Sequence, residues 1–159
     1  MKRFGTVAVG GTFDEFHKGH RALLRKAFKV GDRVLIGLCT EEFARELRKP
    51  HEVATYNERL GELKDFLKSL GVLDRAEIIP LHDPYGPTIS SRSIEAIVVS
   101  RETEPRAREI NVKRRAGGLP PLEVVVIEMV PAENNISIAT TRIRRGEIDR
   151  EGRLLKFGT

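Results

Sequence analysis

Short apolar runs alternate along this chain with segments in which apolar residues recur at helical spacing. The runs Thr6 to Gly10 and Arg33 to Thr40 flank a helical pattern over His20 to Val30, which predicts a β-α-β unit. The alternation continues with predicted helices at about Glu42 to Leu47, Tyr56 to Leu70, Pro105 to Arg115 and Thr140 to Arg145, and predicted strands at about Glu77 to Leu81, Ala96 to Ser100 and Leu122 to Met129. Because the strands are apolar on both faces, we expect an α/β fold with a five-stranded parallel sheet and helices on both faces.

The bulk composition predicts a single domain over residues 1–159. A chain of 159 residues buries roughly two-thirds of its unfolded surface in one core, and 40% of the residues are hydrophobic. No stretch approaches the ~20 apolar residues of a membrane span, and no apolar run follows the basic N-terminal residues. We therefore expect a cytoplasmic protein with no membrane partner. Cys39 is the only cysteine, which excludes an internal disulfide, and its apolar surroundings predict a core side chain.

The positive charge of the chain favours an anionic ligand. The formal net charge is +5, but the basic residues are scattered, with local runs only at residues 113–115 and 142–145. Neither run is accompanied by the aromatic side chains on which single-stranded nucleic acids stack. A small polyphosphate explains the charge equally well, so we expect no nucleic-acid partner.

The first strand-to-helix loop is the place where we expect the ligand-binding site. In parallel sheets ligands bind beyond the carboxyl ends of the strands, and the loop Gly10 to His20 reads G-G-T-F-D-E-F-H-K-G-H. The glycines let the backbone approach a ligand closely, and the N-terminus of the following helix attracts phosphate. His17 and His20 are three positions apart, so both imidazoles can reach the same anion.

Other readings of this loop stay open on the residue types alone. Asp14 or Thr12 can cap the helix while the histidines are solvated, or the histidines can belong to a metal site. The metal reading lacks a third histidine or carboxylate at a fixed short spacing, so we predict no metal-binding residues. Phosphoryl and nucleotidyl transfer need positioning and charge stabilisation, for which imidazole donors are suited.

The order of these residues resembles the signature of the H-x-G-H nucleotidyltransferase superfamily. A strand, then G-T-F-D, two further residues, H-x-G-H and a helix occur here over residues 6–20. The resemblance implies a Rossmann-like fold in which His17 and His20 contact the nucleotide phosphates as catalytic residues, without a covalent intermediate. It also implies ATP contacts at Gly11, Thr12 and Phe13, with Thr12 meeting the acceptor phosphate as well.

A second segment of the same superfamily is found about 120 residues downstream. Residues 136–144 read I-S-I-A-T-T-R-I-R and are similar to the I-S-S-T-x-I-R segment that holds the β and γ phosphates. The likeness implies ATP contacts at Thr140, Thr141 and Arg142. Ala139 stands where a serine is common, so one hydroxyl contact is expected to be missing. The alternative is an N-cap threonine followed by a basic, solvated helix.

Further segments resemble the archaeal and eukaryotic type of phosphopantetheine adenylyltransferase. These are H-D-P-Y-G-P over residues 82–87 and the strand Ala96 to Ser100 followed by R-E-T. The resemblance implies transfer of AMP from ATP to 4′-phosphopantetheine, with Mg²⁺ assisting, and ATP contacts at Ser100 and Arg101. Lys49 falls where that family places a catalytic lysine on the acceptor phosphate, with Arg48 as the competing candidate. Asp83 to Pro87 are either a functional segment or a rigid turn.

Two alternatives remain at this stage. The acceptor can be FMN, nicotinamide mononucleotide or a phosphoalcohol with CTP as donor, because the phosphate-binding motifs do not specify it. The chain can also be a non-catalytic module that binds a nucleotide or RNA. The sequence leaves the oligomeric state open.

Overall fold

The computed structural model describes residues 3–14, 16–46 and 54–128. Five parallel strands form one sheet in the order β3-β2-β1-β4-β5. The strands are β1 (Phe4–Gly11), β2 (Gly31–Cys39), β3 (Ala76–Leu81), β4 (Ala96–Ser100) and β5 (Glu123–Ile127). The helices are α1 (Lys18–Val30), α2 (Glu41–Glu46), α3 (Tyr56–Leu70) and α4 (Glu104–Ala116), with short 3₁₀ turns η1 (Leu73–Arg75) and η2 (Gly86–Ile89).

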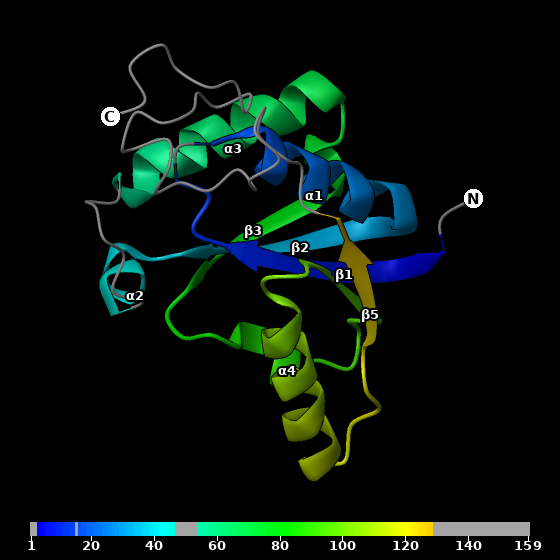
Figure 1. Cartoon of the computed structure of the whole chain (residues 1–159). Helices are drawn as coiled ribbons and strands as arrows, with labels where there is room; N and C mark the ends of the chain where they lie inside the picture. Colours follow the sequence, from blue (N-terminus) through cyan, green and yellow to red (C-terminus); the bar gives the residue numbers. More distant parts are fainter. Residues whose placement is uncertain (1–2, 15, 47–53, 129–159) are drawn as a thin grey trace.

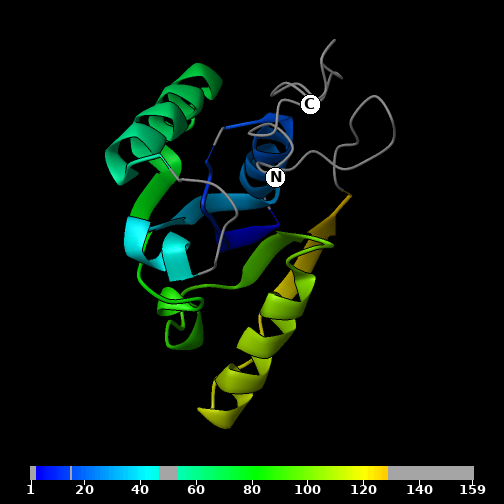
Figure 2. The same cartoon turned by 60° about the vertical axis from the view of Figure 1, so that its left-hand side comes forward.

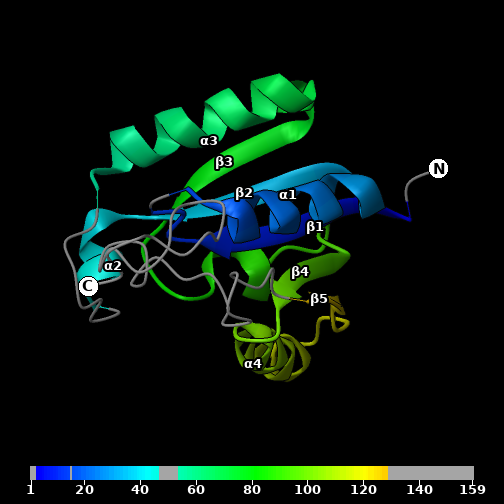
Figure 3. The same cartoon turned by 45° about the horizontal axis from the view of Figure 1, so that its top comes forward.

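Helices cover both faces of the sheet. Helices α1 and α3 lie on one face, while α4 and the η2 turn lie on the other (Figure 1). A view from another side shows α1 and α4 separated by the strands (Figure 2), and α1 running along β1 and β2 (Figure 3). The predicted Rossmann-like α/β fold with a five-stranded parallel sheet is confirmed.

Each face of the sheet packs against its own hydrophobic core. The core under α1 and α3 includes Val7, Val9, Leu24, Ile36, Leu38 and Leu63. The core under α4 is smaller and includes Ala8, Ile94, Ile97, Val99, Ile110 and Leu122. Alternate residues of β1 and β4 therefore enter opposite cores, which explains why these strands are apolar throughout.

The connection from β3 to β4 leaves part of one sheet face without a helix. Residues 82–95 contain only the short η2 turn, although they must cross β2 and β1 to reach β4. Gly10 and Gly37 are register partners on these two strands. A Cβ on Gly37 would lie 2.6 Å from the side chain of Leu81, so the glycine permits this close approach. The side chain of Leu81 therefore packs directly against the sheet at Gly37.

Helix α3 has well-defined ends. The hydroxyl of Thr55 accepts a hydrogen bond from the backbone N–H of Glu58 at 3.1 Å and caps the N-terminus. At the other end Gly71 has a φ of 72°, in the left-handed region that favours glycine. Gly61 lies in the exposed middle of the same helix, with no atom within 4 Å of an added Cβ.

Most predicted elements agree with the structure to within a few residues. Helix α1 begins two residues earlier than predicted, at Lys18, and β5 ends at Ile127. The predicted helix Thr140 to Arg145 lies outside the described residues. In the part of the chain that is described, no helix is long and apolar enough to cross a membrane. The single domain over residues 1–159 and the cytoplasmic location stay predictions.

The two glycines of α3 predict opposite effects of one substitution. Gly71→Ala is expected to lower the free energy of unfolding by about 1 kcal/mol, because a Cβ disfavours the left-handed conformation. Gly61→Ala is expected to raise it by about 0.5–1 kcal/mol, because alanine is the better residue inside a helix. Urea unfolding followed by circular dichroism measures both, and shifts of the same sign would contradict the two backbone conformations.

Candidate active site

A cavity of about 610 Å³ opens where the strand order reverses, between the carboxyl ends of β1 and β4. Such a reversal is where open parallel sheets bind ligands. The cavity has a polar end formed by the first loop and an apolar floor formed by the strands. It brings together these predicted site residues: Gly11, Thr12, Phe13, His17, His20 and Ser100. Cys39 also lines it, besides being buried in the core as predicted.

His17 and His20 cap helix α1 reciprocally. Nδ1 of His17 accepts hydrogen bonds from the backbone N–H groups of Gly19 at 3.1 Å and His20 at 3.4 Å. Nδ1 of His20 accepts one from the backbone N–H of His17 at 3.1 Å. The cap residue is thus His17 rather than Asp14 or Thr12, the two candidates that the sequence offered.

This capping arrangement fixes the protonation pattern of both imidazoles. A ring nitrogen that accepts a hydrogen bond cannot carry the proton, so in each neutral ring the proton lies on Nε2. The two rings are stacked, with centroids 3.7 Å apart and planes 16° apart. In each neutral ring Nε2–H is therefore the group that can donate, and such a donor is suited to an anion at the helix N-terminus.

Phe13 holds the loop in an unusual conformation. Its φ is 51°, in the left-handed region that non-glycine residues rarely adopt, and its side chain is buried. The ring of Phe13 packs 5.2 Å from that of His20, and Phe16 packs on the same histidine at 5.5 Å. The strained turn is thus stabilised by aromatic packing that also orients His20. ATP contact through Phe13 stays a prediction.

The buried side chain of Arg59 connects three segments next to the site through hydrogen bonds to their carbonyl oxygens. Its side chain is 1% exposed, and its Nη1 donates to the carbonyl oxygens of Thr12 at 2.9 Å and Cys39 at 2.6 Å. Its Nε donates to the carbonyl oxygen of Ala54 at 2.9 Å, and the carboxylate of Asp14 accepts from the Ala54 N–H at 3.1 Å. Burial lowers the pKa of Arg59, and Cys39 and Asp14 oppose that shift. Arg59 thereby fixes the ends of β1 and β2 to Ala54, two residues before α3.

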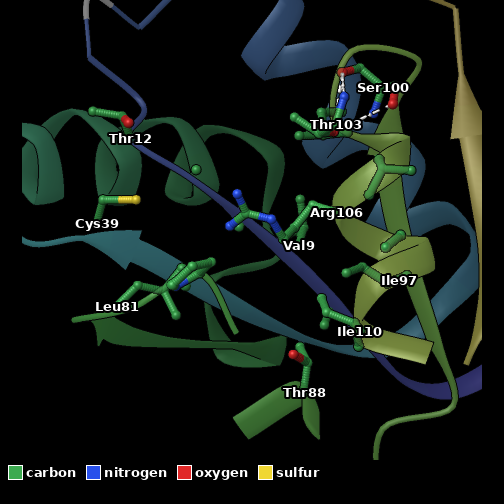
Figure 4. Close-up of a pocket in the computed structure, with 18 of the residues that line it drawn as sticks. Val9, Thr12, Cys39, Leu81, Thr88, Ile97, Ser100, Thr103, Arg106 and Ile110 are labelled. Atoms are coloured by element: carbon green, nitrogen blue, oxygen red, sulfur yellow. Dashed lines mark hydrogen bonds between the residues drawn. The ribbon is translucent and has the colours of Figure 1, made fainter. Parts of the chain in front are cut away.

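At the end of β4, Ser100 and Thr103 bond to each other. The backbone N–H of Ser100 donates to the Thr103 hydroxyl at 3.1 Å, and the two hydroxyls are 3.2 Å apart (Figure 4). Both residues line the cavity, whereas Arg101 between them is not among the described lining residues. Arg101 instead pairs with Glu128 at 2.8 Å, and this pairing raises its pKa. The predicted ATP contacts of Ser100 and Arg101 stay predictions.

Asp83 to Pro87 form a rigid turn that also borders the cavity. The Asp83 carboxylate accepts hydrogen bonds from the backbone N–H groups of Tyr85 and Gly86, each at 2.8 Å. The bonds from Gly86 and Tyr85 hold the pKa of Asp83 below its usual value. Pro84, Tyr85 and Pro87 line the cavity. The structure therefore supports the rigid turn, and a functional role of this segment stays a prediction.

Several residues of the site were missed by the sequence reasoning. Arg59 occupies a buried position four residues before Leu63 in the helical pattern of α3, which is a detectable signal for a structural arginine. Arg114, part of a basic run in the sequence, is likewise buried and donates to the carbonyl oxygens of Thr88 and Ser91. Arg106 lines the cavity, and no feature of the sequence singled it out.

Some predicted site residues lie outside the described residues. They are Arg48, Lys49, Thr140, Thr141 and Arg142, and their roles stay predictions. Among the residues that are described, no group of three or more His, Cys, Asp or Glu side chains is placed to hold a metal ion.

Comparison with known proteins agrees with this geometry. The family model described as cytidylyltransferase-like matches residues 8–146. A phosphopantetheine adenylyltransferase from Methanothermobacter thermautotrophicus is 48% identical over 157 residues, covering 98% of this chain and 93% of that protein. A protein of the same name from Pyrococcus horikoshii is 43% identical over 156 residues and 98% of both chains. A solved structure of a protein of unknown function from Archaeoglobus fulgidus is 33% identical, with a TM-score of 0.70 over 78% of this chain and 98% of that one.

The chain therefore belongs to the cytidylyltransferase-like family, a class of nucleotidyltransferases. Within that class it belongs with the archaeal phosphopantetheine adenylyltransferases, because proteins of that name align with almost its whole length. The resemblance found in the sequence is confirmed at both levels.

The buried position of Arg59 predicts a large effect on stability. Arg59→Ala is expected to lower the free energy of unfolding by about 3 kcal/mol, because three carbonyl oxygens lose a charged donor where water has little access. Turnover should fall as well, since Thr12 loses its anchor. Urea unfolding and a pyrophosphate-release assay measure the two effects.

Arg75 offers a matched control, since it also donates to three carbonyl oxygens, those of Phe28, Gly31 and Asp32. It is only half-buried, so water can replace its hydrogen bonds. Arg75→Ala should therefore cost less stability and leave turnover unchanged. An equal loss of stability in both variants would show that the burial of Arg59 does not explain the size of its effect.

Proposed function

We propose that this chain transfers the AMP part of ATP to 4′-phosphopantetheine, giving dephospho-coenzyme A and pyrophosphate. The observation that carries this proposal is the continuity of the cavity. One space joins the histidine pair at the N-terminus of α1 to an apolar floor on β1, β2 and β3. Its volume of about 610 Å³ is within the usual range for small-molecule sites. Relatives named for this activity support the choice of acceptor.

The two ends of the cavity suit different substrate groups. We place the ATP phosphates at the N-terminus of α1, where the positive end of the helix dipole and the Nε2–H groups of His17 and His20 attract anions. The nucleoside then lies toward Ser100 and Thr103, at the end of β4. The pantetheine arm, which is long and largely uncharged, fits over the apolar floor. That floor includes Ala8, Leu35, Ile79 and Leu81, and the cavity is also lined by Ile97 of β4 and Ile110 of α4.

The proposed reaction is an in-line displacement at the α-phosphorus of ATP. An oxygen of the acceptor's 4′-phosphate forms the new P–O bond, the bond to the β-phosphate oxygen breaks, and pyrophosphate leaves with its electron pair. Negative charge spreads over the non-bridging oxygens in the transition state. Donors that are already oriented by the capping bonds stabilise that charge without reorganisation, which is the role we give to His20 and His17.

The Mg²⁺ that the family resemblance implies fits a site built mainly by substrate. Magnesium usually keeps several waters and binds substrate phosphates rather than a protein cage. We therefore assign the ion to the substrate phosphates rather than to a protein cage. Bound in this way, the ion would neutralise charge on the pyrophosphate leaving group.

The remaining roles complete the proposal. Thr12 meets the acceptor phosphate together with Lys49, or with Arg48 in its place, because two anions must approach each other and their repulsion has to be offset. Thr140, Thr141 and Arg142 hold the β and γ phosphates. Gly11 and Phe13 shape the loop against the nucleotide.

The histidine assignment predicts a defect in turnover. His20→Ala is expected to lower kcat by about a hundredfold or more, the scale of one preorganised donor to the transition state. It should also cost about 1 kcal/mol of stability, because His20 supplies half of the reciprocal cap. Pyrophosphate release from ATP and 4′-phosphopantetheine measures the first effect, and urea unfolding the second.

Gly71→Ala is the matched control for that experiment. It is expected to cost a similar amount of stability, and Gly71 lies at the C-terminus of α3, apart from the residues that line the cavity. Near-normal turnover of the His20 variant would refute the role of this side chain. Turnover by the unmodified protein with FMN or nicotinamide mononucleotide, but not with 4′-phosphopantetheine, would refute the proposed acceptor.

A further inference from the structure

Arg106 brings a positive charge into a cavity whose other described lining residues include no lysine or arginine. It lies in the first turn of α4, and Figure 4 shows its side chain extending into the cavity toward Val9 of β1. Because β1 and β4 are adjacent parallel strands, helices α1 and α4 begin at the same edge of the sheet. A guanidinium group from α4 therefore enters the space bounded by the H-x-G-H loop.

The ion pair that Arg106 makes in the structure is a weak one. Its Nε lies 3.3 Å from Oε2 of Glu109, and the two side chains are 41% and 47% exposed. Exposed pairs of this kind contribute little to stability. The carboxylate of Glu109 also accepts a hydrogen bond from the hydroxyl of Tyr85, so it keeps a partner when Arg106 turns away. Arg106 can exchange Glu109 for a stronger partner.

A phosphate monoester is such a partner. The planar guanidinium group donates two parallel hydrogen bonds to phosphate oxygens, with geometry that an ammonium group does not match. Figure 4 shows Arg106 pointing toward the region between Val9 and Leu81, over the floor where the pantetheine arm is placed. Ser100 and Thr103, at the nucleoside end, lie on another side of the cavity. Arg106 therefore points to the part of the cavity assigned to the acceptor rather than to the part assigned to the nucleoside.

We propose that Arg106 releases Glu109 when the acceptor binds and holds its 4′-phosphate beside the histidine pair. The inference rests on the proposed function, and it adds a phosphate-binding residue on α4 to the residues of the first loop. Arg106 would offset the repulsion between the acceptor phosphate and the ATP phosphates. It would also make the enzyme select phosphorylated acceptors over their unphosphorylated forms.

A thermodynamic cycle tests this contact, in which the arginine is removed from the protein and the phosphate is removed from the ligand, each with and without the other change. Affinities of the unmodified protein and of Arg106→Ala are measured by titration calorimetry with 4′-phosphopantetheine and with pantetheine, at one ionic strength. Loss of a charged hydrogen-bonding partner is expected to weaken binding of 4′-phosphopantetheine at least about tenfold. Binding of pantetheine should change less than about twofold. An equal change for both ligands, or no change for either, would overturn the inference.

Arg108→Ala is the matched control on the same helix. Arg108 is exposed, pairs with Glu104 at 2.7 Å and is not among the described residues that line the cavity. Its removal takes away the same charge from the chain. The affinity for 4′-phosphopantetheine should remain within about twofold of the unmodified protein, and a tenfold loss here would mean that net charge, rather than contact, explains the Arg106 effect.

Glu109→Gln is expected to change the affinity for 4′-phosphopantetheine in the opposite direction. Glutamine keeps a hydrogen-bonding group for Tyr85 but no longer competes for Arg106. Binding of 4′-phosphopantetheine is expected to become about two- to fivefold tighter, the scale of an exposed ion pair, with pantetheine unaffected. A purely structural role of Arg106 would not produce this gain, so unchanged or weaker binding of the phosphorylated ligand would count against the proposed exchange.

Turnover separates this inference from the function on which it rests. If the unmodified protein releases pyrophosphate with 4′-phosphopantetheine and Arg106→Ala raises the KM for that acceptor at least about tenfold, both stand. If the unmodified protein is active and the variant has the same KM, only the role of Arg106 fails. If the unmodified protein is inactive with this acceptor, the proposed function fails whatever the variant does.

Discussion

The central position of β1 is the constraint on which the rest of the structure depends. Because β2 and β3 extend the sheet on one side of β1 while β4 and β5 extend it on the other, the chain must leave β3 and cross the sheet face to reach β4. That crossing contains only the η2 turn, and it leaves a small-residue surface around Gly10 and Gly37. The cavity, its apolar floor and its opening at the end of β1 follow from this path.

The polar end of the cavity is rigid because backbone groups hold its side chains. The two histidines are fixed by the N–H groups of the helix that they cap. Arg59 holds the Thr12 carbonyl from beneath, and the Ser100 and Thr103 hydroxyls satisfy each other. Preorganised donors of this kind stabilise developing charge without moving, which is the main need of nucleotidyl transfer. The same bonds serve folding and, in our proposal, catalysis.

Arginines have three distinct tasks in this small domain. Arg59 and Arg114 are buried and satisfy backbone carbonyl oxygens, so they act as structural crosslinks between segments far apart in the sequence. Arg101 and Arg108 are exposed and pair with glutamates. Arg106 alone among these five lines the cavity. A net charge of +5 therefore says little about where an anion binds, because many of the charged side chains bond to carbonyl oxygens or pair with glutamates.

The sequence alone determined the α/β class, nearly all described strands and helices, the H-x-G-H loop and the family. These depend on local periodicity and on residues close together in the chain, such as His17 and His20. Only the tertiary structure decided that Arg59 joins three segments and that Arg106 enters the cavity. Those facts depend on distances between residues up to 47 positions apart, as for Arg59 and Thr12, and on burial, neither of which a helical or strand pattern encodes.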